Sequence, residues 1–169
     1  QHGIKPRTID RRCIPMLKEL PGDEWFAIDK SVEFVMPQTI EGDIQAFYAG
    51  NSIFVGKQHM SNLGVYCHEL GHAKFYTLGL AKDPKLQKIY NAEKELYTST
   101  FPESRVKSIE YFLEGNQQNM KGLNEACAET NLISDTIQSW DQIQDRTIFF
   151  EQYFPETIAY IRRKYAELI

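Results

Sequence analysis

The spacing of hydrophobic and polar residues changes partway along the chain. Up to about residue 55, the apolar runs are short, rich in aromatic and β-branched residues, and bounded by Pro, Gly or Asn. Such runs are typical of strands, which we expect at 25–28, 31–36, 44–48 and 52–55. The tripeptide Ala49-Gly50-Asn51 predicts a tight hairpin between the last two. From about residue 61, apolar residues recur at helical spacing instead. The pattern predicts an α+β fold, with a small N-terminal antiparallel or mixed sheet and a mostly helical C-terminal part.

Caps and prolines divide the rest of the chain into segments. A first short helix is expected at 8–20, interrupted by Pro15, and Pro37 is expected to end the second strand. Ser61 is a predicted N-cap and Gly79 a predicted stop for the helix between them. Asp83-Pro84 and Pro102-Glu103 predict two further helix starts. A polar loop is expected at 115–119, helices at 123–133, 140–154 and from Pro155 onward, and a loose leader at 1–7.

Length and composition fit one globular domain covering residues 1–169. The net charge is −4 and the basic residues are scattered, so we expect neither a nucleic acid nor a membrane surface as partner. No apolar run approaches the roughly 18 residues that span a bilayer. The three cysteines show no CxxC spacing, so neither a disulfide framework nor a cysteine zinc cluster is indicated. A monomer is expected.

The strongest chemical signal is His68-Glu69-Leu70-Gly71-His72, a His-Glu-x-x-His motif within a predicted helix. Residues four apart on a helix leave the same face, so both imidazoles would point the same way. Two such nitrogens can bind one Zn²⁺ ion. Glu69 lies about 100° further round the helix, where it is suited to take a proton from a metal-bound water rather than to ligate.

A catalytic zinc site commonly has three protein ligands and one water. No histidine follows His72, so the third ligand is expected to be a carboxylate. Glu125 and Glu129 lie one helical turn apart and are separated by Ala126-Cys127-Ala128, small residues that allow close helix packing. One glutamate would bind the metal and the other would orient a histidine. Spacing leaves open which glutamate has which role, and Glu110 and Glu114 are weaker alternatives.

The stretches HELGHAKF, NEACAET and FFEQYFPETIAYI, with a hairpin before them, resemble the catalytic-domain family of anthrax lethal factor and the clostridial Pro-Pro endopeptidases. These are gluzincin metallopeptidases, and the likeness covers about residues 43–161. It implies a zincin-like fold and a zinc-dependent endopeptidase that cleaves a peptide or protein substrate. It also implies His68, His72 and Glu125 as zinc ligands, Glu69 as general base and Glu129 as the carboxylate behind a ligand.

The resemblance leaves three points open. Gln118 stands where the family has a tyrosine that donates to the oxyanion, and Tyr111 is an alternative if the preceding loop is rearranged. An inactive zinc-containing peptide-binding module is therefore the alternative function. The family suggests a secreted protein, whereas the unpaired cysteines would also suit the cytoplasm. In either function, an extended peptide would add to the edge of the hairpin through main-chain hydrogen bonds.

Overall fold

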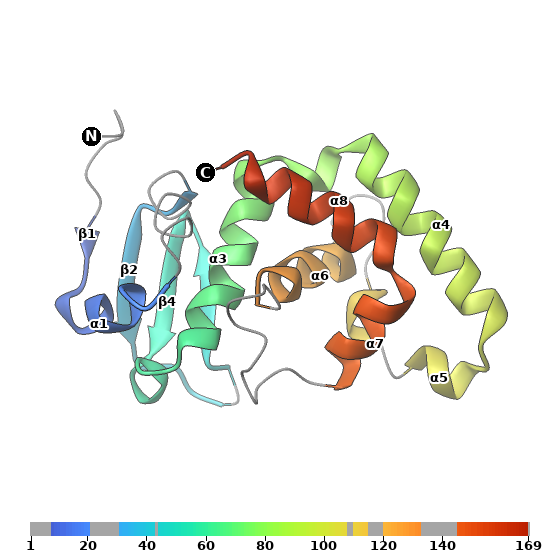
Figure 1. The fold of residues 1–169 in the computed structure, drawn as a ribbon. Coiled ribbons are helices and arrows are strands. Elements are labelled where there is room, and N and C mark those ends of the chain that lie inside the picture. Colours follow the sequence, from blue (N-terminus) through green and yellow to red (C-terminus); the bar gives the residue numbers. More distant parts are fainter. Residues whose placement is uncertain are drawn as a thin grey trace.

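The computed structural model describes residues 8–20, 31–42, 44–107, 110–114, 120–132 and 145–168. They form a small sheet and a larger group of helices, with helix α3 (Leu63–Thr77) between the two (Figure 1). The predicted α+β class and mostly helical second half are confirmed. Within the described part of the chain, no helix has both the length and the apolar character needed to cross a bilayer.

The sheet is mixed and has the strand order β1-β2-β4-β3. Strands β1 (Thr8–Ile9), β2 (Phe34–Gln38) and β4 (Ser52–Gly56) run parallel to one another, and β3 (Ala46–Ala49) pairs antiparallel with β4. The β3–β4 hairpin is confirmed: Gly50 and Asn51 both have positive φ, at 56° and 63°, as a type I′ turn requires. Strand β3 therefore forms one edge of the described sheet.

Two predictions for the N-terminal part are wrong. Thr8 and Ile9 form a strand rather than the start of a helix, and α1 covers only Ile14–Leu17 after a 3-10 turn. Pro37 does not end the second strand but lies inside β2, opposite Val55. Strand β1 pairs with β2 only at Phe34 and Val35, so among the described strands the edge of β2 at Pro37 is unpaired and tolerates a missing N–H. The expected strand at 25–28 lies outside the described residues.

The helix boundaries follow the caps with small shifts. Helix α3 begins one residue later than predicted, with Asn62 rather than Ser61 as N-cap, and Gly79 adopts φ 64° just after its C-cap. Asp83 caps α4 (Pro84–Thr100) through the backbone N–H groups of Lys85 and Leu86, as expected. The remaining helices are α5 (Glu103–Lys107), α6 (Lys121–Leu132), α7 (Asp145–Tyr153) and α8 (Pro155–Ala166). The expected loop at 115–119, the leader at 1–7 and the first residues of the helix predicted at 140–154 lie outside the described residues.

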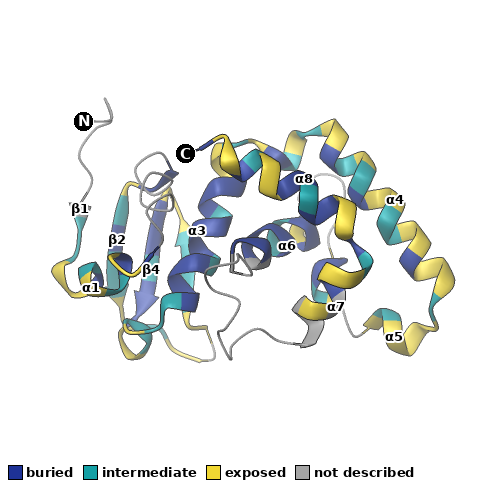
Figure 2. Cartoon of the chain, viewed as in Figure 1, coloured by how far each residue is buried: buried dark blue, intermediate teal, exposed yellow. Residues whose placement is uncertain are grey.

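Two apolar cores lie on opposite sides of α3, which is buried along most of its length (Figure 2). One core joins α3 to the sheet and α1, and includes Leu17, Val35, Ile53, Val55, Tyr66 and Leu70. The other joins α3 to α4, α6, α7 and α8, and includes Phe75, Leu86, Phe112, Leu123, Phe154 and Ile161. Because both cores hold α3, its exposed positions are fixed relative to the sheet edge and to α6.

Candidate metal centre

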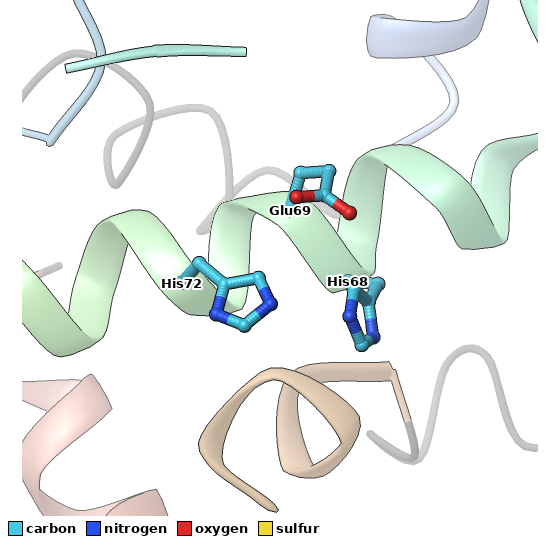
Figure 3. A group of neighbouring side chains, drawn as sticks. All are labelled: His68, Glu69 and His72. Carbon is cyan, nitrogen blue, oxygen red and sulfur yellow. The ribbon is translucent and has the colours of Figure 1, made fainter. Parts of the chain in front are cut away.

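Helix α3 presents two imidazoles toward α6. His68 and His72 are one turn apart, and their ring centroids are 4.9 Å apart at an interplanar angle of 80°. Figure 3 shows both rings leaving α3 on the same side, while Glu69 leaves it farther round. The ligand atoms of the three side chains lie within 4.8 Å of one another. Glu69 is only 6% exposed, so its carboxylate is held in a largely dry environment beside the histidines.

Helix α6 brings Glu125 to these two rings. Oε1 of Glu125 lies 3.3 Å from Nε2 of His68 and 3.1 Å from Nε2 of His72. The three side chains are 20%, 13% and 21% exposed for His68, His72 and Glu125, so the cluster is partly desolvated but still open to solvent. Residues more than fifty positions apart in the sequence therefore meet at one point.

Two of the distances in this cluster are close to those of a tetrahedral zinc site. With metal–ligand bonds of about 2.0–2.1 Å, a regular tetrahedron places its ligand atoms about 3.3–3.4 Å apart. The two nitrogen–oxygen distances, 3.3 and 3.1 Å, lie close to this value. Three of the four ligands would then come from the protein. That is the ligand count of catalytic zinc sites rather than of closed structural ones.

The shared carboxylate oxygen also fits a cation. Oε1 of Glu125 is buried and has no hydrogen-bond partner of good geometry among the described residues, although both ring nitrogens are near it. Burial raises the pKa of Glu125, but His68, His72 and the Tyr111 hydroxyl lower it more, so the net pKa lies below the usual range. The Glu125 carboxylate is thus ionised. A buried anion beside two ring nitrogens favours a positive charge between the carboxylate oxygen and the two nitrogens.

Asn124 fixes the orientation of His72. Its Oδ1 lies 2.7 Å from His72 Nδ1, and its Nδ2 donates to the Tyr76 hydroxyl at 3.1 Å. Since the amide nitrogen serves Tyr76, the amide oxygen accepts the Nδ1–H of His72. In the neutral ring this places the lone pair that a metal ligand needs on Nε2, which lies beside Glu125. The sequence interpretation gave the orienting role to a glutamate and missed this amide. The signal available was a short polar residue directly before the predicted ligand glutamate.

A close helix crossing makes the meeting of α3 and α6 possible. A Cβ atom on Gly71 would lie 2.5 Å from Ala128 Cα and 2.9 Å from its carbonyl oxygen, so only glycine fits there. The Tyr165 hydroxyl of α8 lies 3.1 Å from the Gly71 carbonyl oxygen and 2.7 Å from that of Cys127, across the same crossing.

A buried polar contact holds the two helices further along. Nζ of Lys74 donates to Oδ1 of Asn131 at 2.5 Å, and Nδ2 of Asn131 donates to the carbonyl oxygen of Cys67 at 2.7 Å. The Lys74 ammonium also lies 4.8 Å from the centre of the Tyr165 ring. Buried polar groups that are paired in this way define one arrangement of the helices, and it is the arrangement that carries Glu125 to the histidines.

The other predicted site residues have mixed outcomes. Tyr111, in the 3-10 turn Glu110–Phe112, hydrogen-bonds the Glu125 side chain. Glu114 lies 3.2 Å from Lys121 and Glu110 is exposed, so neither replaces Glu125 in the cluster. The backbone of Glu129 lies in α6, but its side chain is outside the described residues, as is all of Gln118.

Comparison of the chain with known proteins gave no match. No protein-family model matches the chain, and no curated protein or solved structure matches it either. Chemically, the cluster offers two imidazole nitrogens and one carboxylate oxygen to a divalent cation, with a second carboxylate and a phenol hydroxyl beside them.

Proposed function

We propose that this chain is a zinc-dependent endopeptidase with a zincin-like fold. The observation that supports it best is the position of Glu125 Oε1, 3.3 and 3.1 Å from the Nε2 atoms of His68 and His72. These are the ligand types and spacing of a tetrahedral zinc site with one open corner. His68, His72 and Glu125 would hold the ion, and Glu129 is proposed as the carboxylate behind a ligand.

Glu69 is the proposed general base. A zinc ion held by the three ligands would lower the pKa of a bound water and polarise the scissile carbonyl. Glu69, 6% exposed and close to both histidines, accepts the water proton and then passes it to the leaving amine. The low exposure matters because a carboxylate with little bulk water around it exchanges its proton with the reactants rather than with solvent.

Tyr111 is the proposed donor to the oxyanion. Its hydroxyl lowers the pKa of the Glu125 carboxylate and so stands beside a proposed zinc ligand, where a substrate carbonyl oxygen would bind. A phenol O–H aimed at a developing negative charge is a common stabilising group for tetrahedral intermediates. We expect Tyr111→Phe to lower kcat by about 10²–10³-fold while the zinc content is unchanged, whereas a substitution of Gln118 would have a smaller effect.

The substrate is proposed to lie extended along β3. Among the described strands, β3 has β4 as its sole neighbour, so its outer edge offers main-chain groups to a peptide. Strand β3 and α3 pack together through Tyr48 and Tyr76, whose rings stack at 5.6 Å. A peptide added to this edge by β-strand addition would pass beside α3, the helix that carries the two histidines.

Metal analysis and product mass spectrometry test this proposal together. Purified protein should contain about one zinc per chain, and it should cleave a proteome-derived peptide library in a chelator-sensitive way. Glu69→Gln should keep the zinc and lose cleavage, while Glu95→Gln, at an exposed position of α4, should change neither. Stoichiometric zinc without any cleavage would favour the inactive peptide-binding module, and absence of zinc would contradict the metal site itself.

A further inference from the structure

An aromatic pair stands directly beside the candidate metal centre. Tyr48 of β3 and Tyr76 of α3 stack with their ring centroids 5.6 Å apart and an interplanar angle of 16°. Tyr76 also meets Phe75 edge-on at 5.7 Å. Its hydroxyl accepts a hydrogen bond from Asn124, whose amide oxygen binds His72. Tyr76 is therefore joined to the edge strand on one side and to a proposed zinc ligand on the other.

The ring of Tyr76 is held in place although much of it faces solvent. It is 57% exposed, but the stack on Tyr48 and the Asn124 hydrogen bond fix both its plane and its hydroxyl end. An exposed aromatic ring that is already ordered loses little conformational entropy when a ligand covers it. Since Tyr48 occupies one face of the ring, the exposed area belongs to the rest of it.

Strongly exposed large apolar side chains are few in the described part of the chain, and Tyr76 is one of them. Four large hydrophobic residues are strongly exposed there. Tyr76 contacts β3 through Tyr48, and Ile44, which is 59% exposed, lies two residues before the start of β3. The other two, Leu96 and Ile148, lie on α4 and α7. Apolar surface left uncovered next to a candidate active site is typical of a substrate-binding surface.

We propose that Tyr76, supported by Tyr48, is a specificity-determining residue that binds an aromatic side chain of the peptide substrate. This inference rests on the proposed function, because the peptide is taken to lie along β3. A flat ring would stack on the free part of Tyr76, and tyrosine pairs gain affinity from stacking beyond the area they bury. An aromatic residue therefore fits this surface better than an aliphatic or a charged one.

The position of the preferred residue follows from helix geometry. Tyr76 is one turn beyond His72, which is about 6 Å along the helix axis, and two turns beyond His68. An extended peptide advances about 3.3 Å per residue. For a peptide that runs alongside α3, the side chain that reaches Tyr76 belongs to a residue about two or three positions from the scissile bond, always on the same side of it.

Cleavage-site profiling tests the inference. Wild-type protein and the Tyr76→Ala, Tyr76→Phe and Leu96→Ala variants are incubated with the proteome-derived library, and the products are sequenced by mass spectrometry. The wild type should favour Phe, Tyr or Trp at one position within about three residues of the cut. Tyr76→Ala should lose this preference, Tyr76→Phe should keep it because the ring remains, and Leu96→Ala is the matched exposed control.

A peptide pair gives the magnitude. For the best-cleaved library peptide, Tyr76→Ala should lower kcat/KM by about tenfold, whereas for the same peptide with alanine at the preferred position the change should stay within about twofold. The zinc content of each variant is measured alongside. An equal loss on both peptides, or an unchanged aromatic preference in Tyr76→Ala, would overturn the inference.

Failure of the proposed function gives a different result. If the wild type cleaves nothing, the endopeptidase proposal fails, and binding decides the inference alone. Calorimetry on the zinc-loaded Glu69→Gln protein would then compare library peptides pulled down by it with copies in which each aromatic residue is replaced by alanine. If an alanine copy binds more weakly than the original peptide, and this difference disappears in the Glu69→Gln/Tyr76→Ala double variant, the subsite is supported. Equal binding of all peptides contradicts it.

Discussion

Replacing Gly71 by alanine tests whether the α3–α6 crossing sets the metal centre. The added Cβ would lie 2.5 Å from Ala128 Cα and 3.1 Å from its carbonyl carbon. Non-bonded carbons prefer a separation of about 3.5–4.0 Å, so the helices must move apart by about 1 Å. Both obstructing atoms belong to the backbone of α6, and no side-chain rotation can relieve the collision.

The movement would act directly on the proposed ligand set. His68 and His72 are carried by α3, and Glu125 by α6, three residues before Ala128. Zinc sites tolerate deviations of about 0.2 Å in bond length, so a separation of about 1 Å would open the cluster. We expect the zinc affinity to fall by at least the 10–100-fold that is typical of disturbed ligand orientation.

The stability should fall as well. Overpacking of a close contact costs about 1–3 kcal/mol, and the higher helix propensity of alanine offsets at most about 1 kcal/mol of it. The net expectation is a loss of about 0–2 kcal/mol in the free energy of unfolding of the metal-free protein. Urea denaturation without metal measures this term, and competition with a fluorescent zinc chelator measures the affinity.

Two controls sharpen the test. Lys88→Ala adds an alanine at an exposed position of α4 and should change neither quantity. The double variant Gly71→Ala/Ala128→Gly should not recover, because the collision is with the Ala128 backbone and not with its methyl group. Wild-type zinc affinity in Gly71→Ala would refute the reasoning, and recovery in the double variant would refute the assignment to backbone atoms.

The remaining predictions concern single hydrogen bonds. Asn124→Ala removes the acceptor of the His72 Nδ1–H and should weaken zinc binding about 10–100-fold in the same chelator competition, with a retained thermal transition. Glu93→Ala removes the carboxylate that accepts from the N–H groups of Glu156 and Thr157 at the start of α8, and should lower the free energy of unfolding by about 1–2 kcal/mol in urea; unchanged stability would contradict its capping role. Asp83→Asn should make the free energy of unfolding less dependent on pH in the acidic range. Burial raises the Asp83 pKa, but the Tyr160 hydroxyl and two backbone N–H groups lower it more, so the net pKa is below the usual 3.8. The stabilisation is thus complete above that value and is lost as the pH falls through the lowered pKa, and urea midpoints between about pH 2 and 6 should fall more steeply in the wild type than in the variant.

The sequence by itself determined the features that depend on neighbouring residues. The hairpin follows from Gly50 and Asn51, which accept positive φ, and the end of α3 follows from Gly79 for the same reason. The start of α4 follows from Asp83-Pro84, since a cap and a fixed φ act within one turn. The common direction of His68 and His72 is likewise a local property, because helical periodicity alone places them on one face.

Tertiary structure decided which distant groups meet. That Glu125 lies beside the histidines depends on the approach of α3 and α6 at Gly71. That Asn124 rather than a carboxylate holds His72 depends on the rotation of α6 about its axis. Such features are set by the packing of whole helices. This packing depends on many weak contacts between distant residues, so no motif of fixed spacing in the sequence predicts it.

The same reasoning explains the errors in the sheet. Thr8–Ile9 forms a strand because β2 offers it a partner, and Pro37 stays within β2 because β1 is too short to need its N–H. Strand formation depends on a neighbour that is distant in sequence, and short segments have weak preferences of their own. The local sequence thus determined the motif and its helix, whereas tertiary packing determined the place of the Glu125 carboxylate, the orienting amide and the aromatic pair beside them.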